Sequence, residues 1–100
     1  MNSKPSDQAI DDQRRVLRRR VDEPAVIKHE KGTEKGLVRD ISSSGAQLVL
    51  QSAPAPNSTV EIKMEAVGSV RARVKWSDGT RAGAAFEDVP LETIEKIRRL

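Results

Sequence analysis

Five arginines lie within residues 14–20. A guanidinium group can donate two parallel hydrogen bonds to a phosphate or to the O6/N7 edge of guanine, and its flat face can stack on a base. A clustered arginine run therefore indicates an anionic, nucleotide-like partner. A short basic run is equally typical of a solvated charge cluster or of an arm that binds polyanions without specificity. The interpretation needs a second feature of the chain.

The second feature is the stretch RDISSSG at residues 39–45. On a strand, Asp40 and Ser42 would point to the same face, and Gly45 would let the backbone turn tightly or approach a ligand closely. Combined with arginine, an aspartate suits guanine, because arginine donates to O6 and N7 while a carboxylate accepts from the N1 and N2 hydrogens. The same residue types are common turn formers, so a plain serine-rich turn is the alternative.

The composition limits the remaining possibilities. A chain of 100 residues makes one domain with a modest core. Its 18 Lys and Arg against 15 Asp and Glu leave a net charge of only +3, so the basicity is local. The absence of cysteine excludes disulfides and thiolate chemistry. No apolar signal region or membrane-length stretch is found, so we expect a cytoplasmic location and no membrane insertion.

The sequence offers no catalytic constellation. His29 is the only histidine, and the serines at 42–44 have no histidine, cysteine or lysine placed to activate them. No acid–base pair and no cluster of metal ligands can be assembled. We therefore expect a protein that is not an enzyme, with no catalytic residue, no metal and no cofactor.

Short strands are predicted to hold the candidate residues. Residues 1–12 are polar and have no apolar period, which is typical of a tail. From Ala25 onward, polar and apolar residues alternate in short runs that Gly, Pro, Asn and Asp separate. Strands are expected at residues 25–29, 37–41, 46–50, 60–64, 70–76 and 82–86.

The alternation also predicts which side chains face the core. In the fifth strand, Val70, Ala72, Val74 and Trp76 are expected to point inward, and Phe86 likewise in the sixth. Residues 29–36 are expected to form a turn or hairpin loop, and Asp-Gly at 78–79 predicts a tight hairpin. After Pro90, an apolar stripe predicts a final helix. Short antiparallel strands followed by one helix favour a small, partly closed all-β barrel.

Two motifs resemble those of the PilZ domain family. Residues 14–19 read RRVLRR, an RRxxxR pattern, and residues 40–45 read DISSSG, a DxSxxG pattern. The later hairpin is similar too, with V-x-W at residues 74–76 before its turn and G-x-x-F at residues 83–86 after it. The resemblance covers residues 13–88, and the order and spacing of the two motifs are more specific than either motif alone.

The resemblance implies binding of cyclic di-GMP on the outside of an antiparallel barrel of about six strands. Its motifs correspond here to six ligand-binding residues, Arg14, Arg15, Arg19, Asp40, Ser42 and Gly45. Arg15 and Arg19 are the preferred RxxxR pair, because members of the family commonly have an arginine just before the pair, as Arg14 is here. Arg14 and Arg18 also satisfy RxxxR, so the register stays open. The implied organisation is a tail at 1–12, an arginine-rich arm at 13–24, a barrel at 25–88 and a helix at 89–100.

On this interpretation the protein is a receptor or adaptor that passes a signal to an unidentified protein partner, as a monomer or a ligand-dependent dimer. Two alternatives stay open. One is a nucleic-acid-binding module, against which stands the expectation that both aromatic residues point inward and offer no stacking platform. The other is a PilZ-like interaction adaptor that does not bind the nucleotide.

Overall fold

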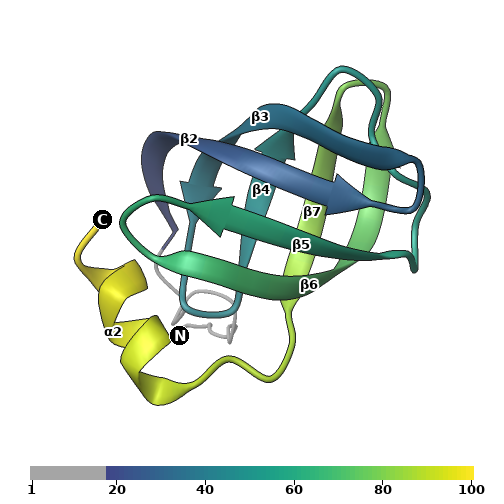
Figure 1. The fold of residues 1–100 in the computed structure, drawn as a ribbon. Coiled ribbons are helices and arrows are strands. Elements are labelled where there is room, and N and C mark those ends of the chain that lie inside the picture. The colour runs from purple at the N-terminus through teal and green to yellow at the C-terminus, as the bar shows by residue number, and fades with distance from the viewer. Residues whose placement is uncertain (1–17) are drawn as a thin grey trace, which may run out of the picture.

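The computed structural model describes residues 18–100 (Figure 1). Its strands run antiparallel and form a closed barrel in the order β2-β3-β4-β7-β6-β5. The elements are β2 (Arg19–His29), β3 (Gly32–Ile41), β4 (Gly45–Val49), β5 (Thr59–Met64), β6 (Gly68–Asp78), β7 (Arg81–Phe86) and helix α2 (Leu91–Arg98). The predicted all-β barrel of about six strands with a C-terminal helix is confirmed, and the barrel is closed rather than partly open.

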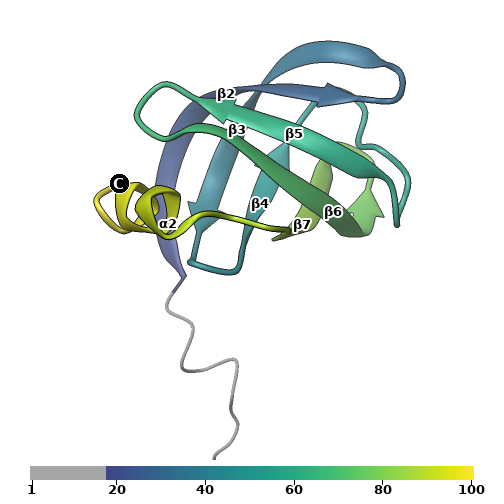
Figure 2. The same cartoon turned by 60° about the horizontal axis from the view of Figure 1, so that its bottom comes forward.

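The inward side chains of the strands form one hydrophobic core. In β5, Val60, Ile62 and Met64 are buried while the residues between them are exposed, as the alternation predicted. Helix α2 contributes Ile97 to the same core and lies beside the start of β2 (Figure 2). Within residues 18–100, no helix is long and apolar enough to cross a membrane.

Strand β2 begins at Arg19, earlier than the expected start at Ala25. Arg19, Arg20, Glu23 and Pro24 pair with β3 on either side of a register shift, and the pairing with β5 begins only at Ala25. At Pro24, β2 is therefore paired with β3 alone. A proline, which has no N–H to donate, is tolerated at such a position. Residues 19–24, which the sequence placed in the arm, are part of the barrel.

The hairpin between β2 and β3 is tighter than expected. Its turn is confined to Glu30 and Lys31, and Gly36, which was expected in the loop, lies inside β3. A Cβ atom on Gly36 would lie 2.6 Å from the carbonyl oxygen of Val49 and 2.7 Å from Cδ1 of Ile27. The glycine is thus required by close packing within the barrel wall and not by a turn.

Register shifts interrupt the ladders in β2 between Arg20 and Glu23, in β3 between Val38 and Asp40, and in β6 between Val74 and Trp76. An extra residue in one strand reverses the face that the following side chains take. In β6 the shift moves Trp76 to the outside of the barrel, where it is 44% exposed. The prediction that Trp76 points into the core is wrong for this reason.

The remaining predicted inward residues of the hairpin do face the interior. Val70, Ala72 and Val74 are buried, as are Ala82 and Ala84. Phe86 is partly buried and packs against the core cluster. The predicted Asp-Gly turn is present, with Gly79 at φ 63° between paired residues of β6 and β7.

Substitution of neighbouring β2 residues tests the assignment of inside and outside. Ile27→Ala leaves a cavity at a fully buried position and should lower the free energy of unfolding by about 2–5 kcal/mol. Val26→Thr keeps a β-branched side chain at a position that is 38% exposed, and it should change stability by less than about 0.5 kcal/mol. Urea denaturation followed by circular dichroism measures both. Equal losses in the two variants would contradict the assignment.

Candidate functional site

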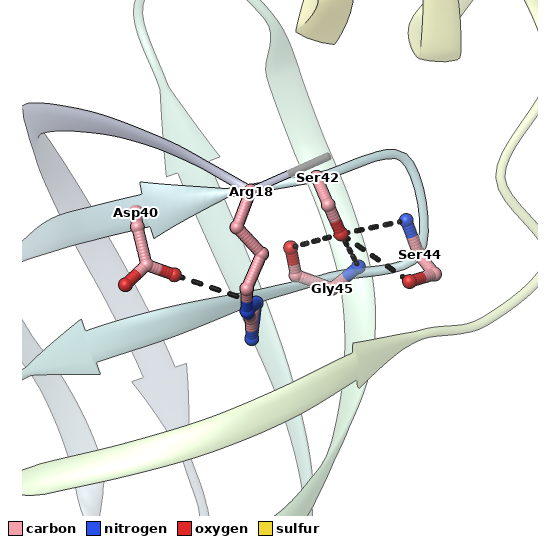
Figure 3. Close-up of polar contacts among 5 residues, drawn as sticks. All are labelled: Arg18, Asp40, Ser42, Ser44 and Gly45. Atoms are coloured by element: carbon pink, nitrogen blue, oxygen red, sulfur yellow. Dashed lines mark hydrogen bonds and ion pairs between the residues drawn. The ribbon is translucent and has the colours of Figure 1, made fainter. Parts of the chain in front are cut away.

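The two sequence stretches meet at one end of the barrel wall. Arg18 immediately precedes β2, while Asp40 lies near the end of β3 and opposite Arg20 in the register of the two strands. Figure 3 shows Arg18 beside Asp40, with Ser42, Ser44 and Gly45 forming the neighbouring β3–β4 turn. Arg14 and Arg15, the other predicted ligand residues, lie outside the described residues.

Asp40 carries a polar group with unused hydrogen-bonding capacity. Nη1 of Arg18 lies 3.4 Å from Oδ1 of Asp40, and the Asp40 side chain is 22% exposed. The same Oδ1 is buried and accepts no hydrogen bond within the described part of the chain. Buried carboxylate oxygens normally have hydrogen-bond partners. Oδ1 of Asp40 is therefore an unused acceptor within residues 18–100, lying under the guanidinium of Arg18.

Arg19 points away from Asp40. Its Nη2 donates to the carbonyl oxygen of Ile97 at 2.8 Å, and its Nη1 donates to the carbonyl oxygen of Leu100. Consecutive residues of a strand face opposite sides, and a cation satisfies the free carbonyls at the C-terminus of a helix. The sequence left two registers of the RxxxR pattern open. In the structure, Arg18 lies beside Asp40, whereas Arg19 contacts α2.

The hydroxyl of Ser42 holds the turn between β3 and β4. Ser42 is 3% exposed, and its Oγ accepts hydrogen bonds from the amides of Ser44 and Gly45, each at 3.2 Å. The Ser42 amide in turn donates to the carbonyl of Gly45 at 2.9 Å. Because β3 ends at Ile41, the expectation that Asp40 and Ser42 project from one strand face does not hold. Ser42 positions the turn next to Asp40.

Gly45 allows β4 and β7 to approach each other. A Cβ atom at this position would lie 2.4 Å from the carbonyl oxygen of Ala84. The amide of Phe86 donates to the carbonyl of Ser44 at 2.9 Å, which continues the same contact into the turn. The glycine of the DxSxxG pattern is thus explained by strand packing beside the site.

The strand registers connect Asp40 to a row of residues across the barrel wall. Asp40 pairs with Gln47 of β4, Gln47 pairs with Gly83 of β7, and Gly83 pairs with Trp76 of β6. We call these four residues the outer row. In the sequence, the outer row is indicated by an aromatic residue that lies opposite a glycine across a hairpin. This pairing recurs in β-sheets.

The outer row and the arginines suit a planar, anionic ligand. Arginine donates to purine edges and phosphates, Asp40 accepts from ring N–H groups, and the row offers an amide and an aromatic ring. Among the residues that the structure describes, no cluster of three or more His, Cys, Asp or Glu could hold a metal ion.

A family model described as PilZ domain matches residues 12–100. No curated protein is similar enough in sequence to match the chain. Among solved structures, the PilZ domain of CeSA from a cellulose-synthesizing bacterium matches with a TM-score of 0.66 at 18% identity, covering 83% of this chain and 92% of that one.

Two further similar structures are complexes with c-di-GMP. PlzA of Borreliella burgdorferi matches with a TM-score of 0.68 at 22% identity, covering 82% of this chain and 38% of PlzA. MrkH of K. pneumonia matches with a TM-score of 0.64 at 17% identity, covering 85% of this chain and 49% of MrkH. At these identities the likeness establishes the fold, and the chain spans less than half of both proteins.

Removal of the Ser42 hydroxyl tests its role in the turn. Ser42→Ala leaves the amides of Ser44 and Gly45 without their acceptor and should lower the free energy of unfolding by about 1–3 kcal/mol. Hydrogen exchange at Gly45 should accelerate accordingly. The exposed neighbour Ser43 supplies the control, since Ser43→Ala should leave both quantities nearly unchanged. An unaffected Gly45 amide in Ser42→Ala would contradict the positioning role.

A pair of arginine variants tests the contact with α2. Arg19→Gln loses the hydrogen bonds to the helix and should destabilise its docking by about 1–2 kcal/mol. Arg20→Gln removes the same charge from a side chain that donates to the carboxylate of Asp22, and it should spare the helix. Hydrogen exchange of residues 91–100 distinguishes the two. Equal protection of α2 in both variants would show that Arg19 does not hold it.

Proposed function

The chain belongs to the PilZ domain family, and on that premise we propose that it is a non-catalytic receptor for cyclic di-GMP. The observation that carries the proposal is the pair of Arg18 and Asp40, in which a carboxylate oxygen accepts no hydrogen bond from residues 18–100 and lies at a polar turn. The c-di-GMP complexes of PlzA and MrkH, which share this fold, support the choice of ligand.

In the proposed complex, a guanine base lies against Asp40. The carboxylate accepts from the N1 and N2 hydrogens, while an arginine donates to O6 and N7. Arg18 neutralises Asp40 in the free protein, and the Arg18 side chain is 52% exposed. Because that pair is only partly buried, a base carrying two donors can replace Arg18 at Asp40, and Arg18 then turns to the base edge or a phosphate.

We assign the arginine pair of the RxxxR motif to Arg14 and Arg18 in preference to Arg15 and Arg19. Arg18 lies beside Asp40, whereas the guanidinium of Arg19 donates to the carbonyl oxygens of Ile97 in α2 and of Leu100 just beyond it. Arg14 and Arg15 lie outside the described residues and enter the proposal as phosphate-binding groups of the arm. Ser42 and Gly45 act by holding the turn that presents Asp40.

The liganded arm and the barrel wall would together form the surface that a downstream protein recognises. A nucleotide bound between residues 13–18 and Asp40 would join the arm to the barrel wall next to the start of β2, and a surface completed by a ligand is a common signalling output. A cytoplasmic location fits such a receptor.

The exposure of Trp76 bears on the nucleic-acid alternative, because it overturns the expectation that both aromatics are buried. Modules that bind single strands stack successive bases on several aromatic side chains. This chain contains only one Trp, one Phe and no Tyr, and Phe86 packs against the core. The single exposed ring favours a small ligand over a continuous strand.

Calorimetric titration with cyclic di-GMP, GTP and a short oligonucleotide tests the function. We expect saturable binding of cyclic di-GMP, weakened about tenfold or more in Arg18→Gln and Asp40→Asn, because each loses a specific base contact worth roughly 1–3 kcal/mol. Arg71→Gln is the matched control, since it removes the same charge from β6, three strands from β3 in the closed barrel, where Arg71 lies opposite Glu61 in the register.

Three other results would each contradict the receptor function in a different way. Equal weakening by Arg71→Gln would indicate a general charge effect. Salt-sensitive oligonucleotide binding without cyclic di-GMP binding would indicate a polyanion arm. Absence of binding to every ligand would indicate an adaptor that recognises protein alone.

A further inference from the structure

Two large aliphatic side chains are exposed away from the candidate site. Val26 on β2 is 38% exposed, and Leu91 at the start of α2 is 68% exposed. A single exposed aliphatic residue is ordinary on a protein surface, so its surroundings decide whether it belongs to a binding surface. The surroundings of these two residues are complementary to each other in shape and in charge.

Val26 lies in a groove on the outer wall of the barrel, where β2 and β5 lie side by side (Figure 1). The groove has a volume of about 510 Å³, and Pro24, Val26 and Gly36 contribute to its lining. It opens where the ladder between β2 and β5 ends, at the pair of Ala25 and Met64. The groove therefore results from the strand pairing, and its floor is largely apolar.

Two lysines flank this apolar floor. In the strand registers, Val26 lies opposite Lys35 of β3 on one side and opposite Lys63 of β5 on the other. Side chains that lie opposite each other in antiparallel strands project from the same face. Both lysines are exposed and line the groove, and Glu65 adds one negative charge at the end of β5. An occupant of the groove should thus present an apolar side chain next to carboxylates.

The N-terminal half of α2 presents this pattern. Leu91, Glu92 and Glu95 are all exposed, and residues four apart such as Leu91 and Glu95 are neighbours on one helix face. Arg98, which is also exposed, continues the same face seven residues after Leu91. The helix is anchored to its own barrel by a different face, on which Ile97 is buried. The exposed face is therefore available to another molecule.

We propose that the exposed face of α2 docks into this groove on a second copy of the chain. Leu91 packs beside Val26, Glu95 faces Lys63, and Arg98 faces Glu65. Two such contacts, related by a two-fold axis, form a dimer in which each molecule gives one helix and receives one. Opposite charges around the apolar contact favour this arrangement over other relative orientations.

The dimer does not depend on a ligand. The groove lining contains neither Arg18 nor Asp40, so the inference goes beyond the proposed function and does not rest on it. Self-association is expected in the protein alone, and it leaves the candidate site of each molecule free.

Sedimentation equilibrium of the full chain without ligand tests the dimer. The apparent mass should rise with protein concentration from that of one chain towards that of two. Leu91→Arg should weaken dimerisation at least about tenfold, because it places a cation against the lysines of the groove. Leucine and arginine have similar helix propensities, so α2 should stay folded, which circular dichroism verifies. A wild-type mass that does not change with concentration would overturn the proposal.

Charge reversal tests the orientation of the helix in the groove. Lys63→Glu and Glu95→Lys should each weaken the dimer, because each brings like charges together, and the double variant should recover it. Lys31→Glu makes the same charge change in the exposed turn between β2 and β3, and it should associate as the wild type does. Failure of the double variant to recover, or equal weakening by Lys31→Glu, would contradict the proposed contacts.

One variant of the candidate site separates the dimer from the receptor function. Asp40→Asn, which should weaken cyclic di-GMP binding, should dimerise as the wild type does. Dimerisation that is lost in Asp40→Asn, or that occurs only when cyclic di-GMP is added, would overturn this interface.

Discussion

Each residue of a closed barrel faces either the core or the solvent, and the direction alternates along each strand. The site depends on breaks in this alternation. Val38 and Ile41 are both fully buried, whereas Asp40 reaches the surface between them, which a regular strand would not permit for residues 38 and 40. The register shift at Arg39 allows Val38 to be buried and Asp40 to be exposed. The register shift in β6 does the same for Val74 and Trp76. The same local irregularities preserve the core and expose the polar and aromatic groups.

The regular parts of the fold could be predicted from the sequence because alternation is a direct consequence of strand geometry. β5 follows the period-2 pattern without interruption. The bulges could not be predicted in this way, since one inserted residue leaves no distinct composition and only shifts the phase of the later strand residues. The start of β2 was missed for a related reason: Asp22, with φ at 46°, and Pro24 look like strand breakers, yet a bulge and one-sided pairing accommodate both.

The sequence indicated which residue types belong to the candidate site, but not how their side chains are arranged. Residue types alone identified Asp40 and the arginine run as a pair suited to guanine. A run of consecutive arginines satisfies the RxxxR pattern in two registers, and only the strand direction distinguishes Arg18 from Arg19. Ser42 and Gly45 fit their motif by residue type, but their contacts show that they shape the turn.

The one-sided pairing at the start of β2 has a consequence for self-association. Within residues 18–100, positions 19–24 of β2 are paired with β3 and not with β5, which leaves a short strand edge. Such edges can recruit a strand from another molecule and so begin aggregation. This edge carries a bulge, the proline at 24 and the charged Arg20, Asp22 and Glu23, all of which hinder intermolecular strand pairing. The start of β2 is thereby protected against uncontrolled strand pairing, and two copies meeting there would have to do so through side chains.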